Sequence, residues 1–454
     1  MADASVCASR LPDPAVLSCS NEFGGGVPTF FRTWLASVGR RAFSRLVVRS
    51  RRDSRPACRR DKRQAGEHAG QRRGVRVLSL TYEYPPLGGG GGRAAAALNQ
   101  QLARQGIEVE VLTSRMKGLP ATERLGPVTV HRTWCWRRYE HFTTAPELAT
   151  TLIPAWREGC RLVEANRPDL LHAHFVLPSG IVAWRLAQRY DLPYVITAHG
   201  SDIPGYNPDR FMRLHELLAP LWTRVATNAS LLISPSEFLA GLIRRRARLP
   251  VRIIPNGYEP SSALGMPKRN LVLVVARMFP RKGVQRFIEA IPDLSSEWEY
   301  VIAGDGPQLP KLKQQAAKLG VPVRFLGFVD AQTLRSYYEQ ARVLVFPSIR
   351  ENFPMVLLEA MDAGCAVITT DAEGCGEVVG DAGVVVEKDN AGRIRSALAD
   401  LMKDPVRCDV LGRRAQARAE SFRWPRIAAL YQNAFESVLG YAPPSTATRP
   451  HIVA

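Results

Sequence analysis

The sequence predicts an α/β protein with two doubly wound parallel sheets, one after the other along the chain. From residue 74 onward, short apolar runs typical of buried strands alternate with longer segments that have the apolar spacing of helices. The alternation stops in a loose stretch at 258–268, which contains two prolines and two serines, and then starts again. A length of 454 residues also fits two domains better than one core. We therefore expect two sheets that face each other across a cleft, with ligands at the carboxyl ends of the strands.

The first half is expected to begin with a strand at 75–81, a glycine-rich loop and a helix at about 93–105. Gly106 follows this helix, at a position where glycine commonly ends a helix. Ser234 is expected to cap a later helix, because Pro235 suits the first helical position and Glu237 completes a capping box. The other strands of this half are expected at 108–113, 128–133, 170–175, 194–198, 231–234 and 251–255.

The second half repeats the alternation, and a final amphipathic segment at 424–439 predicts a helix that closes the chain. Its strands are expected at 271–276, 300–303, 323–326, 343–346, 366–370 and 383–386. The expected domains are a basic extension at 1–73, a first domain at 74–257, a second at 258–423, a helix at 424–440 that packs back towards the first domain, and a loose tail at 441–454.

The first 73 residues form the most basic part of the chain. Lys and Arg occupy 13 of the 34 positions from Arg40 to Arg73, and the whole chain has a formal net charge of +19. Such a segment buries too little apolar surface to fold, so we expect it to be disordered. Binding to anionic lipid or nucleic acid and an extension without a function both remain open. Because no aromatic interleaving or base-reading module accompanies the arginines, we expect no specific nucleic-acid partner.

The remaining composition indicates a cytoplasmic protein. No run of about 18 apolar residues occurs, so no membrane-spanning helix is expected. The first 30 residues lack the basic start and apolar core of a secretory signal. The eight cysteines are scattered without C-x-x-C spacing, which argues against a zinc ribbon and favours reduced thiols.

Two clusters of residues could bind a phosphate. The run from Gly88 to Gly92 lies between a predicted strand and a predicted helix, where backbone N–H groups can approach an anion, although a flexible loop is an equal alternative. Arg277 ends a predicted strand of the second half, and Arg281-Lys282-Gly283 is expected to open the next helix. These cations could simply be solvated on the surface. We favour binding of a diphosphate, because the carboxyl end of a parallel strand is the expected ligand crevice.

Two glutamates stand eight residues apart in the segment from Glu351 to Glu359. Pro354 suits a first helical turn, which places Glu351 in the preceding loop and Glu359 in the second turn of the helix. Carboxylates in these positions can accept hydrogen bonds from sugar hydroxyls, while the free N–H groups between them face a phosphate. Such a pair alone is common by chance.

Taken together and in order, the motifs of the chain resemble those of a known family from residue 75 to about 439. The family is that of the family-4 retaining glycosyltransferases (glycosyl transferases group 1), which have the GT-B fold. The motifs are Tyr84-Pro85-Pro86 with the following glycines, Arg167-Pro168-Asp169 through His174, Thr197-Ala198-His199-Gly200-Ser201-Asp202, Ser234-Pro235-Ser236, Pro255-Asn256-Gly257, Arg277 with Lys282-Gly283, Gly304-Asp305-Gly306-Pro307, Glu351 with Glu359, Ala360-Met361-Asp362-Ala363-Gly364, and Gly376-Glu377-Val378-Val379.

The resemblance implies a role for each matching residue. Arg277 and Lys282 would hold the diphosphate of a UDP- or GDP-sugar and neutralise the charge on the leaving nucleotide. His199 would lie near the hydroxyls of the sugar. The residues that the resemblance places at the reacting centre are His199, Glu351, Arg277 and Lys282. Those that it places around the donor are Gly89, Gly90, Arg277, Lys282, Gly327, Val329, Glu351, Asn352, Phe353 and Glu359, with Glu359 on the ribose, Glu351 on the transferred sugar, and backbone groups at 327–329 beside the base.

The resemblance also implies a retaining transfer, for which we favour front-face attack helped by the leaving phosphate. Since no D-x-D motif occurs and basic side chains can replace a cation at the diphosphate, we expect no metal and no cofactor. His172 and His174 alternate on a predicted strand and could share a metal, but the sequence offers no third ligand. The alternative is that one of them lines the cleft while the other is buried and hydrogen-bonded.

The acceptor is expected to bind the first domain and to be a polysaccharide, a lipid-linked sugar or a glycolipid. The segment 134–142 mixes aromatic residues and cations, which fits either contact with an anionic membrane at the inner face of the cytoplasmic membrane or packing on a neighbouring element. Two other functions remain open. One is a nucleotide-sugar epimerase or hydrolase, and the other is a binding protein of the same fold that has lost catalysis.

Overall fold

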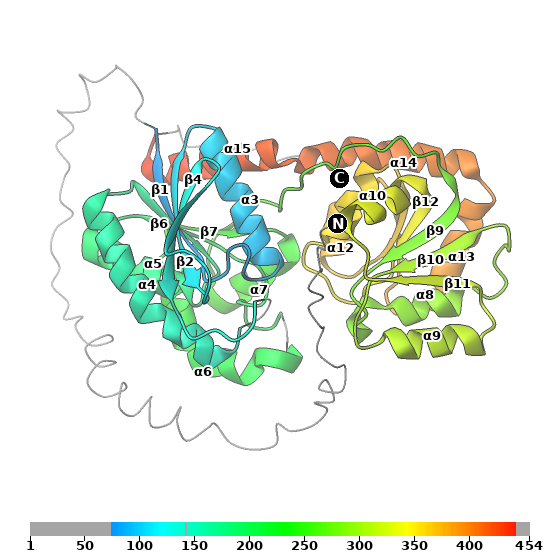
Figure 1. Cartoon of the computed structure of the whole chain (residues 1–454), viewed down its shortest axis with the longest axis horizontal. Helices are drawn as coiled ribbons and strands as arrows, with labels where there is room; N and C mark the ends of the chain where they lie inside the picture. Colours follow the sequence, from blue (N-terminus) through cyan, green and yellow to red (C-terminus); the bar gives the residue numbers. More distant parts are fainter. Residues whose placement is uncertain (1–73, 141–142, 207, 442–454) are drawn as a thin grey trace, which may run out of the picture. The chain divides into compact units, whose positions relative to one another are not determined.

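The computed structural model describes residues 74–140, 143–206 and 208–441, and it confirms the α/β class with two mainly parallel sheets (Figure 1). The expected disorder of 1–73 and the loose tail beyond residue 441 lie outside the described residues. The first sheet has the order β3-β4-β2-β1-β5-β6-β7-β8, and only the β3–β4 pair is antiparallel. Its strands are β1 (Arg76–Leu80), β2 (Glu108–Arg115), β3 (Thr122–Leu125), β4 (Val128–Trp134), β5 (Leu170–His174), β6 (Tyr194–Thr197), β7 (Leu231–Ser234) and β8 (Val251–Ile253).

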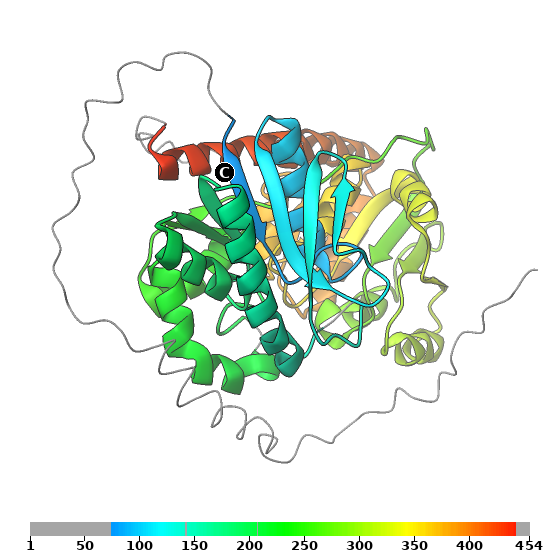
Figure 2. The same ribbon diagram turned by 60° about the vertical axis from the view of Figure 1, so that its left-hand side comes forward.

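The helices of the first half cover both faces of this sheet, as the turned view in Figure 2 shows. Leu78, Leu80 and Leu112 point to one face and pack with α5, whereas Val77 and Val109 point to the other face, towards α3. This division follows from the alternation of side chains along a strand. The helices are α3 (Gly90–Arg104), α4 (Ala145–Ala165), α5 (Ser179–Tyr190), α6 (Pro208–Thr227) and α7 (Glu237–Ala247).

The second sheet is wholly parallel and has the order β11-β10-β9-β12-β13-β14. Its strands are β9 (Arg269–Val275), β10 (Glu299–Ala303), β11 (Val323–Gly327), β12 (Ala341–Phe346), β13 (Ala366–Thr370) and β14 (Val384–Val386). The helical segments of this half are η2 (Pro280–Lys282), α8 (Val284–Ala290), α9 (Leu309–Lys318), α10 (Ala331–Gln340), α11 (Met355–Asp362), α12 (Gly374–Val379), α13 (Ala391–Met402), α14 (Pro405–Ala419) and η3 (Glu420–Phe422), and α15 (Trp424–Leu439) follows.

Two helix starts differ from the sequence prediction. Ser234 does not cap α7, because it is the last residue of β7 and pairs there with Ile253. Ser236 is the cap instead, and its Oγ accepts a hydrogen bond of 3.2 Å from the N–H of Leu239. Helix α3 begins at Gly90 rather than at Arg93, so the end of the glycine run is helical.

The last helix, α15, packs on the first half beside α3 (Figure 1). Ile427, Tyr431 and Phe435 belong to the same buried cluster as Val77 and Val109 of the first sheet. The chain therefore passes twice between the halves, before β9 and before α15, and Tyr258 and Arg423 form a parallel bridge where the two passages meet.

Gly257 lies directly against the ring of Trp424 at this crossing, and we expect its replacement by alanine to destabilise the protein. A Cβ at this position would lie 2.4 Å from the indole carbons of Trp424. Overpacking of a well-filled site costs about 1–3 kcal/mol, so the urea midpoint should fall. Gly241→Ala is the matched control, because nothing lies within 4 Å of the new methyl group. Equal midpoints for both variants would contradict the prediction.

Candidate functional site

The carboxyl edge of the second sheet brings Lys282 and Glu351 together as an ion pair. Lys282 ends the turn η2 after β9, and Glu351 follows β12. Lys282 Nζ contacts Glu351 Oε1, and Ser348 Oγ donates a 3.1 Å hydrogen bond to the same oxygen. The two charged side chains are only 13% and 14% exposed. An ammonium group held in this way is oriented and little solvated, as a group that binds an anion requires.

Close backbone packing fixes the turn that carries Lys282. Gly283 has a φ of +67°, and a Cβ there would lie 1.8 Å from the carbonyl oxygen of Pro347. The N–H of Ile349 donates to the carbonyl of Arg281 at 2.8 Å, which joins this turn to the segment after β12. Only glycine permits this approach, so Gly283 determines where Lys282 lies.

The neighbouring strand ends supply an exposed rim. Arg277 is exposed after β9, and its guanidinium lies 5.7 Å from the centre of the Phe279 ring. Two strands away, β11 ends at Gly327, whose carbonyl accepts a 2.7 Å hydrogen bond from the N–H of Gly304. Phe328 is 84% exposed, whereas Val329 packs against the core. Because parallel strands end at the same edge, this rim adjoins the ion pair.

The segment after Glu351 leads into α11 as the sequence predicts. Pro354 precedes the helix and Glu359 lies in its second turn. Tyr338 OH donates a 2.8 Å hydrogen bond to Glu359 Oε2, and burial raises the pKa of Glu359. Phe353 packs on Phe422, with the ring centres 5.9 Å apart. Glu359 is thus held beside the helix start, while Phe353 has a packing role.

Asn352 connects the second half to the first. Its Oδ1 accepts a 2.6 Å hydrogen bond from Ser236 Oγ, and its Nδ2 donates to the carbonyl of His199 at 3.3 Å. Glu377 of α12 accepts hydrogen bonds from the N–H groups of Glu237 and Phe238 at 2.7 and 3.0 Å. The structure therefore gives Glu377 a role at the start of α7, where a carboxylate is favoured by the helix dipole. The motif Gly376-Glu377-Val378-Val379 alone does not predict this role for Glu377.

His199 follows β6 and is held by a buried aspartate that the sequence analysis did not single out. Asp202 Oδ1 accepts hydrogen bonds from the N–H groups of His199 and Gly200 at 3.1 and 3.0 Å. Asp202 Oδ2 accepts one of 2.8 Å from the N–H of Val176. Burial lowers the pKa of His199 to about 4, so the ring is neutral near pH 7. The T-x-H-G-x-D spacing was the available signal for Asp202.

The glycine run meets His199 from the other side. A Cβ at Gly91 would lie 2.5 Å from the ring of Phe175 and 3.3 Å from Cγ of His199. The N–H of Gly89 donates to Glu83 Oε2 at 3.0 Å, while a Cβ added at Gly90 would meet nothing within 4 Å. Of the predicted pair of glycines, Gly90 is therefore the open one, and Glu83 already occupies the N–H of Gly89.

His172 and His174 are both buried, so neither of them lines the surface of the site. This differs from the expectation that one of them would, and the reason is that their strand, β5, is covered by α15. No group of three or more His, Cys, Asp or Glu side chains within the described residues is arranged to hold a metal ion.

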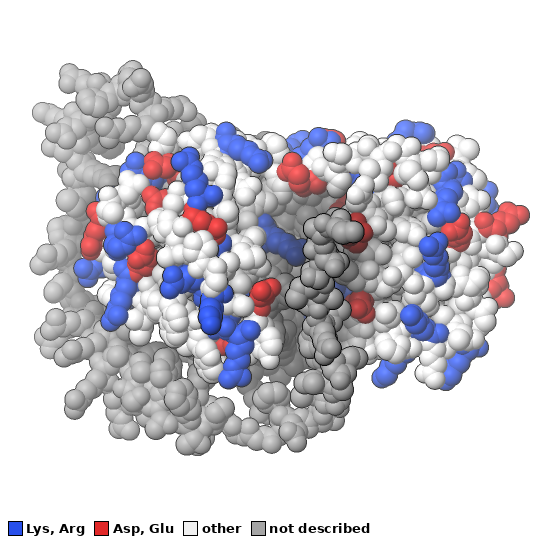
Figure 3. Space-filling model, in the orientation of Figure 1, with Lys and Arg blue, Asp and Glu red and all other residues white. Residues whose placement is uncertain are grey.

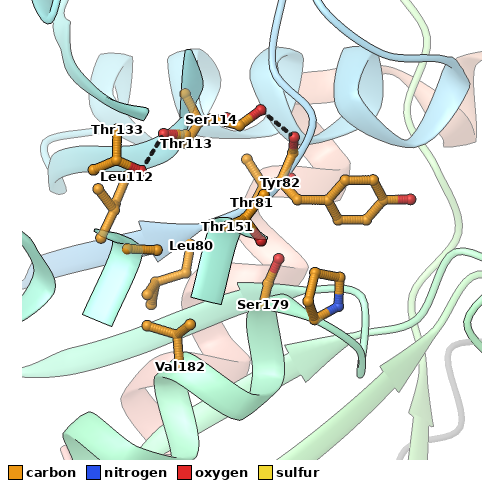
Figure 4. A pocket seen from close by; sticks show the side chains of 12 residues that line it. Leu80, Thr81, Tyr82, Leu112, Thr113, Ser114, Thr133, Thr151, Ser179 and Val182 are labelled. Carbon is orange, nitrogen blue, oxygen red and sulfur yellow. Dashed lines mark hydrogen bonds between the residues drawn. The ribbon is translucent and has the colours of Figure 1, made fainter. Parts of the chain in front are cut away.

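A pocket lies at the carboxyl ends of β1 and β2, between the sheet and helices α4 and α5 (Figure 4). The ring of Tyr82 in its wall lies 4.7 Å from that of Phe175, which in turn lies 4.5 Å from His199. Thr113 Oγ1 is buried and has no hydrogen-bond partner among the described residues. No motif in the sequence indicates this pocket, because its walls come from several distant segments. The lining residues are Leu80, Thr81, Tyr82, Leu112, Thr113, Ser114, Thr133, Thr151, Ala155, Pro178, Ser179 and Val182.

The described surface is mixed in charge and includes exposed aromatic side chains. On the face seen in Figure 3, basic and acidic side chains are interspersed. In the segment 134–140, Trp134, Trp136 and Tyr139 are exposed, and Arg138 lies 4.9 Å from the Trp136 ring. Arg137, by contrast, is buried. The five cysteines in the described part of the chain are free thiols, and no helix there is both long and apolar enough to cross a membrane.

Comparison with known proteins identifies the family. The model of Glycosyltransferase Family 4 matches residues 88–262, and that of Glycosyl transferases group 1 matches residues 261–418. The chain is 29% identical over 406 residues to the D-inositol 3-phosphate glycosyltransferase of Streptomyces scabiei, covering 79% of this chain and 90% of that protein.

Solved structures agree on the fold. A sucrose-phosphate synthase from Thermosynechococcus elongatus superposes with a TM-score of 0.66 at 22% identity, over 81% of this chain and 100% of the other. The Anabaena protein HepE in complex with UDP-glucose superposes with a TM-score of 0.59 at 19% identity, over 80% and 100% of the two chains. With both family models matched in succession and the GT-B fold in place, this chain belongs to the family-4, group 1 glycosyltransferases.

Proposed function

We propose that this glycosyltransferase moves a hexose-type sugar from a UDP- or GDP-sugar to a polysaccharide, a lipid-linked sugar or a glycolipid, with retention of anomeric configuration. The observation that carries the proposal is the shielded ion pair of Lys282 and Glu351 at the strand ends of the second sheet. In this place Lys282 can bind the diphosphate of a sugar nucleotide, while its partner Glu351 can accept hydrogen bonds from the sugar. The UDP-glucose complex of the structurally similar HepE supports a donor of this kind.

In this proposal the diphosphate lies between Lys282 and Arg277. The exposed guanidinium of Arg277 is free of any described ion pair, so it can turn to a phosphate without breaking one. The base lies along the rim at Gly327 and Val329. Glu359 accepts hydrogen bonds from the ribose hydroxyls. Burial raises the pKa of its carboxyl group, and the hydrogen bonds from the ribose lower that pKa again.

The reaction that we propose needs neither a metal nor a cofactor. As the bond between the sugar and the phosphate breaks, negative charge develops on the leaving diphosphate, and the two cations stabilise it. The acceptor hydroxyl attacks the sugar on the face from which the diphosphate leaves, so the anomeric configuration is retained. An oxygen of the leaving phosphate takes the proton of that hydroxyl. Glu351 contacts the transferred sugar, and neutral His199 lies near the sugar hydroxyls.

We place the acceptor on the first half and the enzyme in the cytoplasm, at the inner face of the membrane. The exposed Trp134, Trp136 and Tyr139 with Arg138 support contact with an anionic lipid surface, because aromatic rings favour the interface and cations favour its charge. This contact would bring the enzyme to a lipid-linked acceptor.

Calorimetric titration with UDP and with GDP, in the presence of EDTA, tests the donor site. We expect saturable binding of one of the two nucleotides by the wild type and binding at least about tenfold weaker by Lys282→Ala, since a charge-assisted contact is worth about 1.5–3 kcal/mol. The titration also identifies the base.

Arg281→Ala is the matched control, because Arg281 is the adjacent cation and is exposed. Its affinity should stay within about twofold of the wild type. Failure of the folded wild type to bind either nucleotide would overturn the proposal and favour a protein that has lost catalysis. An equal loss of affinity in both variants would mean that net charge, and not the site, binds the nucleotide.

A further inference from the structure

Two buried imidazole rings, those of His172 and His174, lie beneath His199 in the first half. His174 Nδ1 lies 3.1 Å from His199 Nε2, and the ring of His172 lies 4.3 Å from that of His174. His172 and His174 are 0% and 1% exposed. Parallel pairing places His174 opposite Thr197, two residues before His199, so the backbone brings these rings together.

All three rings are neutral near pH 7, because burial lowers the pKa of His199 to about 4, of His172 to about 3 and of His174 well below its usual value. A neutral imidazole carries one proton and one free electron pair on its two nitrogens. The contact between His174 and His199 therefore has one donor and one acceptor. The contact uses Nε2 of His199 in either case, so which ring donates decides whether the remaining nitrogen, Nδ1, presents a proton or a free electron pair to a ligand.

The outer nitrogen of His174 indicates which ring donates. His174 Nε2 is buried and has no hydrogen-bond partner among the described residues. A buried N–H without an acceptor is rarer in proteins than an acceptor that lacks a donor, so the proton is better placed on Nδ1. His174 Nδ1–H then donates to His199 Nε2, and His199 must carry its own proton on Nδ1.

His172 also has one ring nitrogen with a hydrogen-bond partner and one without. His172 Nδ1 is buried and lacks a partner in the described part of the chain, whereas its Nε2 lies 2.8 Å from Thr197 Oγ1. With the proton on Nε2, His172 donates to Thr197, whose hydroxyl is then free to donate to Tyr431 OH at 3.3 Å. Each buried ring thus keeps its proton on the nitrogen that has a partner.

We propose that His174 is a positioning residue that holds His199 as its Nδ1–H tautomer, so that His199 offers the sugar or the acceptor a hydrogen-bond donor and not a base. This inference deepens the proposed function, on which the place of His199 near the sugar rests. His199 then orients a hydroxyl or stabilises an oxygen that gains charge, while the proton of the acceptor goes to the leaving phosphate.

The tautomer can be read without substrate, by long-range proton–nitrogen correlation spectra of the full chain labelled with ¹⁵N-histidine. The chain has eight histidines, and the His199 signals are those that disappear in His199→Asn. We expect a protonated Nδ1 and an unprotonated Nε2 for His199. A protonated Nε2 on His199 in the wild type would overturn the inference.

Two variants of His174 separate positioning from mere packing. His174→Phe keeps a ring of similar size but has no donor, so His199 should lose its single tautomer and kcat should fall about tenfold, with KM for the donor sugar nearly unchanged. His174→Asn places an amide N–H near the former Nδ1 and should restore both the tautomer and most of kcat. An unchanged kcat in His174→Phe, with the tautomer lost, would also overturn the inference.

Because the spectra are recorded without substrate, they distinguish a failure of this inference from a failure of the proposed donor site. If neither nucleotide binds but His199 still shows the Nδ1–H form, the proposed function fails while the hydrogen bond from His174 stands. If His174→Phe does not fold, the wild-type spectrum and His174→Asn still decide.

Discussion

Replacing Lys282 by methionine is expected to lower kcat by about 10²–10³-fold, the usual cost of removing one preorganised group that stabilises charge in a transition state. Methionine is one atom shorter than lysine but keeps an unbranched apolar chain beside Phe346, whose ring centre lies 5.5 Å from the ammonium. The charge is lost, and Glu351 is left without its cation beside the departing diphosphate. The measurement is the rate of nucleoside diphosphate release from the sugar nucleotide whose base the titration identifies.

Arg281→Met serves as the control, and its kcat should remain within about twofold of the wild type. The urea midpoint of Lys282→Met must also be measured, because loss of one partner from a shielded ion pair destabilises the fold. A folded Lys282→Met variant with wild-type kcat would remove Lys282 from the catalytic machinery.

Acidification is expected to destabilise the first half strongly, because His172 and His174 are buried in the neutral form. In the unfolded chain both take up a proton below about pH 6.5, whereas burial lowers the pKa of His172 in the folded state to about 3. The unfolded state therefore binds more protons between about pH 6.5 and pH 3, and stability falls as the pH falls through this range. At pH 5 the loss is about 2 kcal/mol for His172. His174 adds to the loss in the same direction, because burial lowers its pKa as well.

The urea midpoint of His172→Gln at pH 7 and pH 5 tests this cause. Glutamine stays neutral and can still donate to Thr197, so the loss of stability between the two pH values should be about 2 kcal/mol smaller than in the wild type. Carboxyl groups such as Glu359 titrate equally in both proteins, so their effects cancel in the comparison. A pH dependence that is the same in both would show that His172 does not take part.

The fold could be predicted closely because its signals are local. Apolar runs predict the parallel strands of both sheets, and Gly106, with a φ of +92°, follows the end of α3 as its type suggests. The errors in the predicted elements also have physical reasons. Strand β3 was missed because a short antiparallel edge strand with the sequence TERL has no apolar face. The prediction of Ser234 as a cap is wrong, because the sequence does not distinguish the last residue of a strand from the residue before a helix.

The site could be predicted less completely, because much of it depends on contacts between distant segments. The spacing of Glu351 and Glu359 is visible in the sequence. The ion pair between Glu351 and Lys282 is not, because it depends on the close approach of Gly283 to the backbone of Pro347. Asn352 was assigned to the donor, yet its side chain joins Ser236 to the backbone of His199. Asp202 and Glu83 carry polar atoms that orient their neighbours through backbone N–H groups, and no periodic pattern reveals such bonds.

The position of α15 has a consequence for how the chain is made. Tyr431 and Phe435 complete a buried cluster that begins with Val77, so side chains more than three hundred residues apart must meet before that face of the first sheet is covered. A ribosome delivers α15 after every other described element. During synthesis, the apolar side chains on this face of β1 and β2 therefore wait in contact with solvent or a chaperone until the final helix emerges. Such late completion makes the first half depend on a helix that is made after the whole second sheet, although its own strands are made first.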